Sequence, residues 1–203
     1  MNLPNNLVNY IWVGSSPIPD KFYSNFEKAQ QMNPEFVFKL WRDTDIVQNT
    51  EKYREIYNSL SIFHKLQIGK YTIMNSHGGI YSDFDIDWKV PFSIVYDSIE
   101  GDPDMVFMYR DSLHFYNMGM KTTLVDDFFS ITKPGNTHKY LTYCEQRTER
   151  RDNITEPYSV YALTEWLLNV DNVKFLTHKQ IDVSAESLFG IHDNKRTWGL
   201  DSC

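Results

Sequence analysis

Three aspartates alternate with apolar residues in one short segment of the chain. Asp83, Asp85 and Asp87 are separated by Phe84 and Ile86. Successive side chains of a β-strand point to opposite faces, so we expect the aspartates on one face and the apolar side chains in the core. Carboxylates that share a face repel one another unless a cation neutralises them. The spacing therefore predicts a divalent-cation site held by Asp83 and Asp85, with Asp87 as an additional candidate.

The expected cation is Mn²⁺ or Mg²⁺, because such hard cations take oxygen ligands and commonly keep phosphate oxygens and water in their remaining positions. Two carboxylates and a diphosphate would complete an octahedral site, so a diphosphate ligand is the expected partner. The residues alone leave one alternative open. An Asp-x-Asp pattern is short, and the same segment could be a solvated edge strand that binds no metal.

The segments around these aspartates alternate between strand and helix patterns. We expect strands at residues 8–13, 36–41, 80–87, 105–109 and 173–176, and helices at residues 20–31, 62–76, 139–150 and 159–170. Asp20 is expected to cap the first helix and Gly78–Gly79 to end the second. The order predicts an α/β fold with a single, mainly parallel central sheet flanked by helices. Because ligands bind at the carboxyl ends of such strands, Trp12–Gly14 and Asp83–Asp87 are expected at one edge of the sheet.

Length, charge and cysteine content narrow the class of protein. The 203 residues suit a single domain, residues 1–203, and would also suit a domain excised from a longer protein. A formal net charge of −7 gives no basic footprint, so no nucleic-acid partner is expected. The sequence has no apolar run of membrane-spanning length and no signal-peptide pattern, which predicts a cytoplasmic location and no membrane segment. Cys144 and Cys203 lack a CxxC spacing, so neither a zinc site nor a disulfide framework is expected.

Four stretches of the sequence, in order, resemble the DXD sugar-binding region of glycosyltransferase family 32. That family includes yeast-type mannosyltransferases and is related to the glucosylating domains of large clostridial toxins. The stretches are Tyr10–Gly14, Lys70–Asp85, Phe129–Asn136 and Gly190–Trp198. The resemblance implies a GT-A type fold and a metal-dependent glycosyltransferase. Such an enzyme would move a sugar from a nucleotide sugar, UDP-sugar ahead of GDP-sugar, to a hydroxyl of a glycan or other acceptor, with retention of configuration.

The resemblance also suggests the nucleotide site. The tryptophan of the opening strand is expected to stack on the base, and the segment near the end of the chain to close over the diphosphate. Gln67 and Lys70 lie three residues apart on one helical face, where the family has aspartate and arginine. A lysine lacks the bidentate geometry of an arginine, so the identity of the nucleotide stays open. The residues expected to bind the nucleotide are Trp12, Val13, Gln67, Lys70, Asp83, Arg196 and Trp198.

Further residues are expected to complete the metal shell and to act on the sugar. His192 or Asp193 would join Asp83 and Asp85 at the cation. Asp126 and Asp127 precede the stretch that resembles the donor-sugar pocket, although on the residues alone the pair could equally cap a helix. With Asp85 they are the candidate catalytic residues. A retaining front-face reaction needs no strong protein nucleophile, whereas an inverting reaction would use Asp126 or Asp127 as general base.

Two other functions remain compatible with the sequence. The departures at Gln67 and Lys70 would suit a protein that binds nucleotide sugars without transferring them. Alternatively, the acidic segment would suit a metal-dependent phosphohydrolase. The polar segment from His192 to Trp198, flanked by Gly190 and Gly199, is expected to act as a lid that the donor orders.

Overall fold

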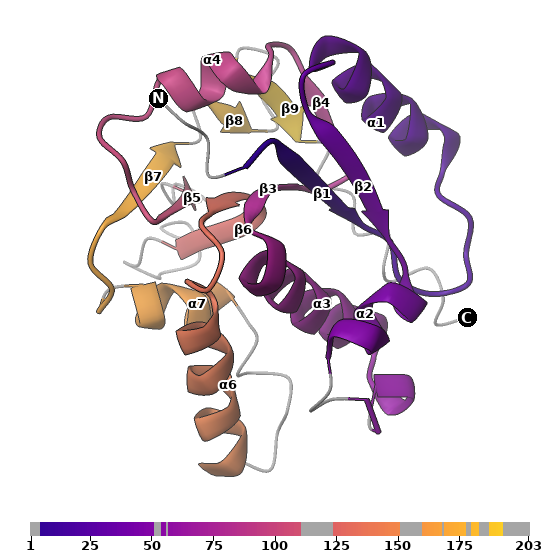
Figure 1. Ribbon diagram of the computed structural model, residues 1–203, viewed down its shortest axis with the longest axis vertical. Coiled ribbons are helices and arrows are strands. Elements are labelled where there is room, and N and C mark those ends of the chain that lie inside the picture. The colour runs from indigo at the N-terminus through magenta and orange to yellow at the C-terminus, as the bar shows by residue number, and fades with distance from the viewer. Residues whose placement is uncertain are drawn as a thin grey trace, which may run out of the picture.

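The computed structural model describes residues 5–50, 54–55, 57–110, 124–150, 160–167, 169–177, 180–182 and 187–192. Helices and strands alternate along this part of the chain (Figure 1). The elements are β1 Leu7–Ile11, α1 Asp20–Met32, β2 Val37–Trp41, α2 Asp43–Asn49, the short 3₁₀ helix η2 Tyr57–Ser59, α3 Ile62–His77, β3 Gly79–Ser82, β4 Ile86–Trp88, α4 Phe92–Asp97, β5 Met105–Arg110, β6 Leu124–Thr132, α6 His138–Arg150, α7 Val160–Leu167, β7 Val173–Thr177, β8 Ile181–Asp182 and β9 Gly190–His192.

The central sheet has the strand order β2-β1-β3-β6-β5-β7. β1 pairs in parallel with β2 and with β3, and β5 pairs in parallel with β7. β6 runs antiparallel to both of its neighbours, β3 and β5. The predicted mainly parallel sheet is therefore confirmed, with one reversed strand in its interior. A second, smaller sheet has the order β4-β9-β8.

Helices cover both faces of the central sheet (Figure 1). Successive side chains of β1 point to the two helix layers. Tyr10 packs with α1, α4 and the small sheet, whereas Ile11 packs with α2 and α3. α6 and α7 continue the second layer over β5 and β6. The expected helix face with Phe22, Phe26 and Ala29 is buried against the first of these layers. The result is a three-layer α/β architecture, in which the parallel strands β1 and β3 end at the same edge of the sheet.

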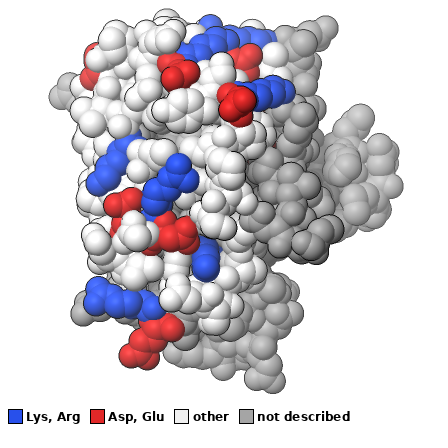
Figure 2. Space-filling view, turned by 90° about the vertical axis from the view of Figure 1, so that its right-hand side faces the viewer, with Lys and Arg blue, Asp and Glu red and all other residues white. Residues whose placement is uncertain are grey.

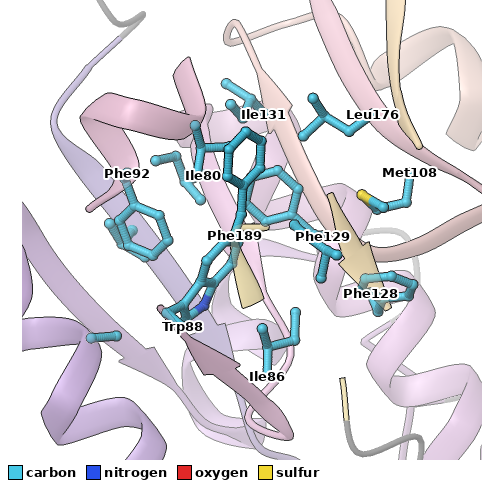
Figure 3. Close-up of a cluster of buried hydrophobic side chains, with 14 of the residues drawn as sticks. Ile80, Ile86, Trp88, Phe92, Met108, Phe128, Phe129, Ile131, Leu176 and Phe189 are labelled. Carbon is cyan, nitrogen blue, oxygen red and sulfur yellow. The ribbon is translucent and has the colours of Figure 1, made fainter. Parts of the chain in front are cut away.

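The largest core cluster joins the small sheet to the central one. Figure 3 shows aromatic and aliphatic side chains from β3, β4, α4, β5 and β6 interdigitating, together with Phe189. Trp88 of β4 is fully buried, with ring centroids 4.8 Å from Phe92 and 5.1 Å from Phe129. Its Nε1 donates to Ser82 Oγ at 3.1 Å. β4 is thus fixed against the end of β3, and so is the short connection between them.

Two glycines allow α3 to pass directly into β3. Gly78 has φ 63° and Gly79 has φ 90°, which is the region that favours glycine. A Cβ at Gly78 would lie 2.6 Å from Pro134 Cδ, and one at Gly79 would collide with the main-chain oxygen of Leu7. The predicted helix end at this glycine pair is confirmed, and its physical reason is close backbone approach as well as torsional freedom.

The structure corrects several expected elements. Residues 80–87 do not form one strand: β3 and β4 belong to different sheets, and Asp83–Asp85 form the turn between them. Pro19, not Asp20, precedes the first residue of α1. Asp126 and Asp127 cap no helix, because they lie within β6, a strand that the sequence analysis did not predict. His192, the first residue of the predicted lid, ends β9 between β4 and β8. The rest of the predicted lid, residues 193–198, lies outside the described residues.

The charged surface is mixed where it can be seen. Figure 2 shows Lys and Arg side chains beside Asp and Glu on the face it presents, without an extended patch of one sign. In the described part of the chain, no helix is long and apolar enough to cross a membrane.

Candidate functional site

Four segments meet at the carboxyl edge of the central sheet. Trp12 follows β1, and Asp83 follows β3. β6 enters the sheet from the same edge, since Phe129 pairs with Ser82 and the Asp83 N–H donates to the Phe128 carbonyl at 2.8 Å. The backbone of His192 in β9 lies opposite Ile86 of β4. The acidic turn, the start of β6 and the last described strand are therefore neighbours.

The turn Asp83–Asp85 is held in place by its central phenylalanine. Phe84 is 5% exposed, and its ring lies 4.9 Å from Tyr10, 5.7 Å from Trp12 and 5.7 Å from Phe26, measured between centroids. Asn25 Nδ2 of α1 donates to the Phe84 carbonyl at 3.1 Å. With the apolar residue buried, the two flanking aspartates are held at the edge of the sheet. The sequence analysis expected Phe84 in the core, and the structure confirms this, although in a turn instead of a strand. Asp85, which was expected on the opposite face with Asp83, is buried as well.

The two aspartates of the turn have different surroundings. Asp83 is partly exposed, and its Oδ1 accepts a hydrogen bond from the hydroxyl of Tyr81. Burial, followed by the charge of Asp83, raises the pKa of the Tyr81 phenol well above its usual range, so Tyr81 is a neutral donor. Asp85 is 9% exposed. Asp87 of β4, the additional metal candidate, forms an ion pair with Lys28 of α1 on the exposed surface.

β6 carries a bulge at the second acidic segment. Phe107 of β5 pairs with Ser130, but the next residue, Met108, pairs with Asp126. Residues 127–129 are therefore extra residues on the β6 side, and such irregularities commonly redirect side chains near functional sites. The Asp127 side chain meets α3, where its Oδ2 lies 3.0 Å from Lys70 Nζ and 2.8 Å from the Tyr71 hydroxyl. Burial raises the pKa of the Tyr71 phenol well above its usual range, and the charge of Asp127 raises it further.

Lys70 connects the two acidic segments. Its Nζ also donates to the main-chain oxygen of Asp127 at 2.9 Å. The same ammonium lies 4.5 Å from the centroid of the Tyr81 ring, a cation–π distance. Since Tyr81 donates to Asp83, a continuous series of contacts runs from Asp127 through Lys70 and Tyr81 to Asp83.

The end of β1 forms the third part of the site. Trp12 is partly buried, and its Nε1 donates to the Ser16 carbonyl at 2.7 Å. Val13 is buried in the core on the α2 and α3 side, so a contact between this residue and a nucleotide would come from its main chain. The Gly14 N–H donates to Asp43 Oδ2 at 2.7 Å, which ties the end of β1 to the start of α2.

The donor set of the turn suits a hard divalent cation. Asp83 and Asp85 offer carboxylate oxygens, which Mn²⁺ and Mg²⁺ prefer, and two protein carboxylates leave positions for phosphate and water. Within the described ranges, no group of three His, Cys, Asp or Glu side chains could hold a metal ion on its own. A cation here would therefore need ligands from a bound phosphate, from water or from residues outside those ranges.

The structure describes some of the remaining predicted residues fully, some by their main chain only, and others not at all. Gln67 lies one turn before Lys70 on α3 and is 5% exposed. For Asp126 and His192 the structure describes the main chain only. Asp193, Arg196 and Trp198 lie outside the described residues.

Several residues of the site were not predicted from the sequence. Asn25 could have been found, since it stands among Phe22, Phe26 and Ala29 on the buried face of α1, where a polar side chain needs a partner. Tyr71 and Tyr81 are ordinary core residues by sequence, and only the fold brings their hydroxyls to Asp127 and Asp83.

Two sequence comparisons relate this chain to glycosyltransferases. Residues 19–106 match a family model described as a glycosyltransferase sugar-binding region containing a DXD motif. An uncharacterized glycosyltransferase, L373 of Acanthamoeba polyphaga mimivirus, is 32% identical over 89 residues, which cover 40% of this chain and 35% of that protein. The match thus spans about a third of the length of this relative.

Solved structures support the fold. The PaToxG glycosyltransferase aligns with a TM-score of 0.58 and 13% identity over 80% of this chain and 68% of that chain. The galactosyltransferase LgtC, solved in complex with donor and acceptor sugar analogues, aligns with a TM-score of 0.47 and 11% identity over 87% of this chain and 74% of that chain. The fold assignment rests on the first of these.

These findings confirm the resemblance inferred from the sequence. The segment that matches the glycosyltransferase sugar-binding region, residues 19–106, contains Asp83–Asp85. The fold is of the GT-A type.

Proposed function

We propose that this chain catalyses metal-dependent transfer of a sugar from a nucleotide sugar to a hydroxyl acceptor. The observation that carries the proposal is the anchored turn at the carboxyl edge of the sheet. Phe84 fixes its backbone, so Asp83 and Asp85 are held at the place where ligands bind in such sheets. UDP-sugar is the favoured donor and GDP-sugar the second choice. A cytoplasmic location remains a prediction from the sequence.

Asp83 and Asp85 would hold Mn²⁺ or Mg²⁺, with His192 or Asp193 as further candidates. The cation, when bound, supplies Lewis-acid stabilisation of the negative charge on a departing diphosphate. The Tyr81 hydroxyl keeps Asp83 in one orientation, and Asn25 keeps the turn against α1. These contacts are the kind of preorganisation that an electrostatic site needs.

The other side chains would bind and orient the donor. Trp12 would offer a face to the base, because it follows β1 at the carboxyl edge of the sheet and its ring is held nearly perpendicular to that of Phe84. Arg196 and Trp198 are proposed neighbours of the diphosphate. Asp127, at the bulge of β6, would face the donor sugar and accept a hydrogen bond from one of its hydroxyls.

The proposed reaction retains configuration. The acceptor hydroxyl attacks the anomeric carbon as the bond to the diphosphate breaks, and the hydroxyl proton passes to the departing diphosphate on the same face. No carboxylate is then needed as base. Asp127 Oδ2 already receives hydrogen bonds from Lys70 and Tyr71, which suits an oriented acceptor of hydrogen bonds better than a group that must take up a proton.

Product analysis tests the proposal. The protein is incubated with Mn²⁺ and each of UDP-glucose, UDP-galactose, UDP-N-acetylglucosamine and GDP-mannose, with and without a mixture of simple sugar acceptors. We expect release of the nucleoside diphosphate with transfer to a sugar, or slower release of free sugar when only water is present. Release of a nucleoside monophosphate or of orthophosphate would instead indicate a phosphohydrolase. Tight binding without any turnover would indicate a nucleotide-sugar-binding protein.

A further inference from the structure

We infer that Lys70 is a positioning residue, which holds Asp127 for the donor sugar and does not bind the nucleotide itself. This inference rests on the proposed function, because it requires a sugar at the ligand edge. It departs from the sequence analysis, which placed Lys70 among the nucleotide ligands because an arginine occupies this position in the family that the chain resembles.

The first step is the coordination of the Lys70 ammonium. An ammonium has three N–H donors. Nζ reaches the main-chain oxygen of Asp127 at 2.9 Å and Oδ2 of the same residue at 3.0 Å, and its remaining side faces the Tyr81 ring at 4.5 Å. The side chain is 2% exposed. A contact with a phosphate would therefore require the ammonium to leave one of these three partners.

The second step is what these contacts do to Asp127. Asp127 lies in the extra residues of the β6 bulge, where regular pairing with β5 is interrupted. A bulged segment has fewer ladder hydrogen bonds to define its conformation, so it depends on other contacts. Lys70 binds both the side chain and the main chain of Asp127, and so fixes the carboxylate and the backbone that carries it.

The third step is the rigidity of the support. Lys70 and Tyr71 are consecutive residues of α3, and both reach Asp127 Oδ2. α3 is buried between the sheet and α6, where the Tyr71 ring lies 4.4 Å from the ring of Tyr140. Carboxylate, lysine and tyrosine therefore share one buried framework. Two donors from a packed helix hold the Asp127 carboxylate at the edge where the donor sugar would lie.

The experiment compares two dissociation constants for each variant. Calorimetry with Mn²⁺ gives the Kd of a bare nucleotide and of its sugar conjugate, using UDP with UDP-glucose and UDP-galactose, and GDP with GDP-mannose. The nucleotide and sugar conjugate that the wild type binds most tightly are then used for all variants. We expect Lys70→Met to weaken binding of the nucleotide sugar about tenfold, as for a lost hydrogen bond to a charged group, and to change binding of the bare nucleotide less than about twofold.

Two further variants separate positioning from packing. Lys70→Arg keeps a cation beside Asp127 and should recover part of the lost affinity for the sugar conjugate, whereas a packing role predicts that the uncharged Met is the better replacement. Lys39→Met is the matched control, because the Lys39 ammonium also lies over an aromatic ring, 3.4 Å from the centroid of Trp41, and belongs to none of the segments assigned to the site. It should leave both dissociation constants unchanged.

Lys70→Met leaves a carboxylate buried without its cation and can fail to fold. The double variant Lys70→Met/Asp127→Asn removes both charges and keeps the test available. Its loss of affinity for the sugar conjugate should equal that of Asp127→Asn alone, because both changes act on one carboxylate. Parallel weakening of nucleotide and sugar conjugate, or no weakening in either Lys70 variant, would overturn the inference.

Two results distinguish failure of the inference from failure of the proposed function. If Asp127→Asn weakens binding of the sugar conjugate no more than binding of the bare nucleotide, Asp127 contributes no sugar contact and the inference alone is wrong. If the wild type binds none of the nucleotides, the proposed function fails and the inference fails with it.

Discussion

The two acidic segments of the site are fixed in opposite ways. The turn Asp83–Asp85 is held by the burial of Phe84 and by the hydrogen bond from Asn25 to the Phe84 carbonyl. The bulge of β6 is held through the carboxylate itself, because Asp127 binds Lys70 and Tyr71 of α3. One segment has an apolar anchor beside its acids, and the other uses its acid as the anchor.

This difference separates the roles of the acids. Asp83 accepts a hydrogen bond from Tyr81, a neutral phenol. Asp127 faces a lysine that neutralises it. A cation is therefore expected at the turn, and an uncharged hydroxyl at the bulge. Variants that change the contacts of the turn but keep its two aspartates test this difference.

The largest expected effect comes from removing the apolar anchor. Phe84→Ala should lower the free energy of unfolding by about 3–5 kcal/mol, the usual cost of truncating a buried phenylalanine. Urea denaturation measures the change. Phe175→Ala is the matched control, since Phe175 is 41% exposed, and should cost less than about 1 kcal/mol. Equal losses for the two variants would mean that the turn has another anchor.

The next effect concerns the base. Trp12→Ala should weaken UDP binding roughly tenfold or more, because stacking of a base on an aromatic ring contributes about 1–3 kcal/mol. Trp12→Phe keeps a ring but loses the hydrogen bond to the Ser16 carbonyl, and should retain most of the affinity. A Trp12→Ala protein that unfolds without a selective loss of affinity would make Trp12 a core residue.

The smallest effect concerns the orientation of Asp83. Tyr81→Phe removes the hydroxyl that donates to Asp83 and keeps the ring beneath Lys70. Loss of one such hydrogen bond should weaken Mn²⁺-dependent UDP binding by about twofold to tenfold. Tyr23→Phe on the exposed face of α1 serves as control. If UDP affinity with EDTA falls by the same factor, Tyr81 acts on the fold and not through Asp83.

Much of the fold could be predicted from hydrophobic periodicity. The apolar stripe of α1 and the Gly78–Gly79 break were sufficient to place a helix and a strand start, because local pattern alone determines them. The strand from 80 to 87 could not be divided from sequence. Phe84 and Ile86 fit one alternating strand, and only the positions of β6 and β9 require the chain to turn and enter a second sheet.

The same limit on prediction from sequence applies to the residues of the site. Asp83 and Asp85 could be predicted as metal ligands because two carboxylates lie two positions apart in the sequence. The bonds that orient them were not, since Tyr81 and Asn25 act through contacts that only the fold creates. Lys70 illustrates the point most clearly: its residue type suggested a phosphate ligand, whereas its burial and its ion pair with Asp127 favour a positioning role.

The central claim is that nucleotide binding depends on a divalent cation held by Asp83 and Asp85. The most direct measurement is calorimetric titration of UDP into the wild type, once with Mn²⁺ and once with EDTA, and into Asp85→Asn with Mn²⁺. We expect UDP affinity to fall on the order of a hundredfold in EDTA. Mutating residues that merely support the metal ligands of a site costs up to about a hundredfold, and EDTA removes the metal itself. Asp85→Asn should stay folded and match the EDTA result. Equal UDP affinity with EDTA and with Mn²⁺ would contradict the account.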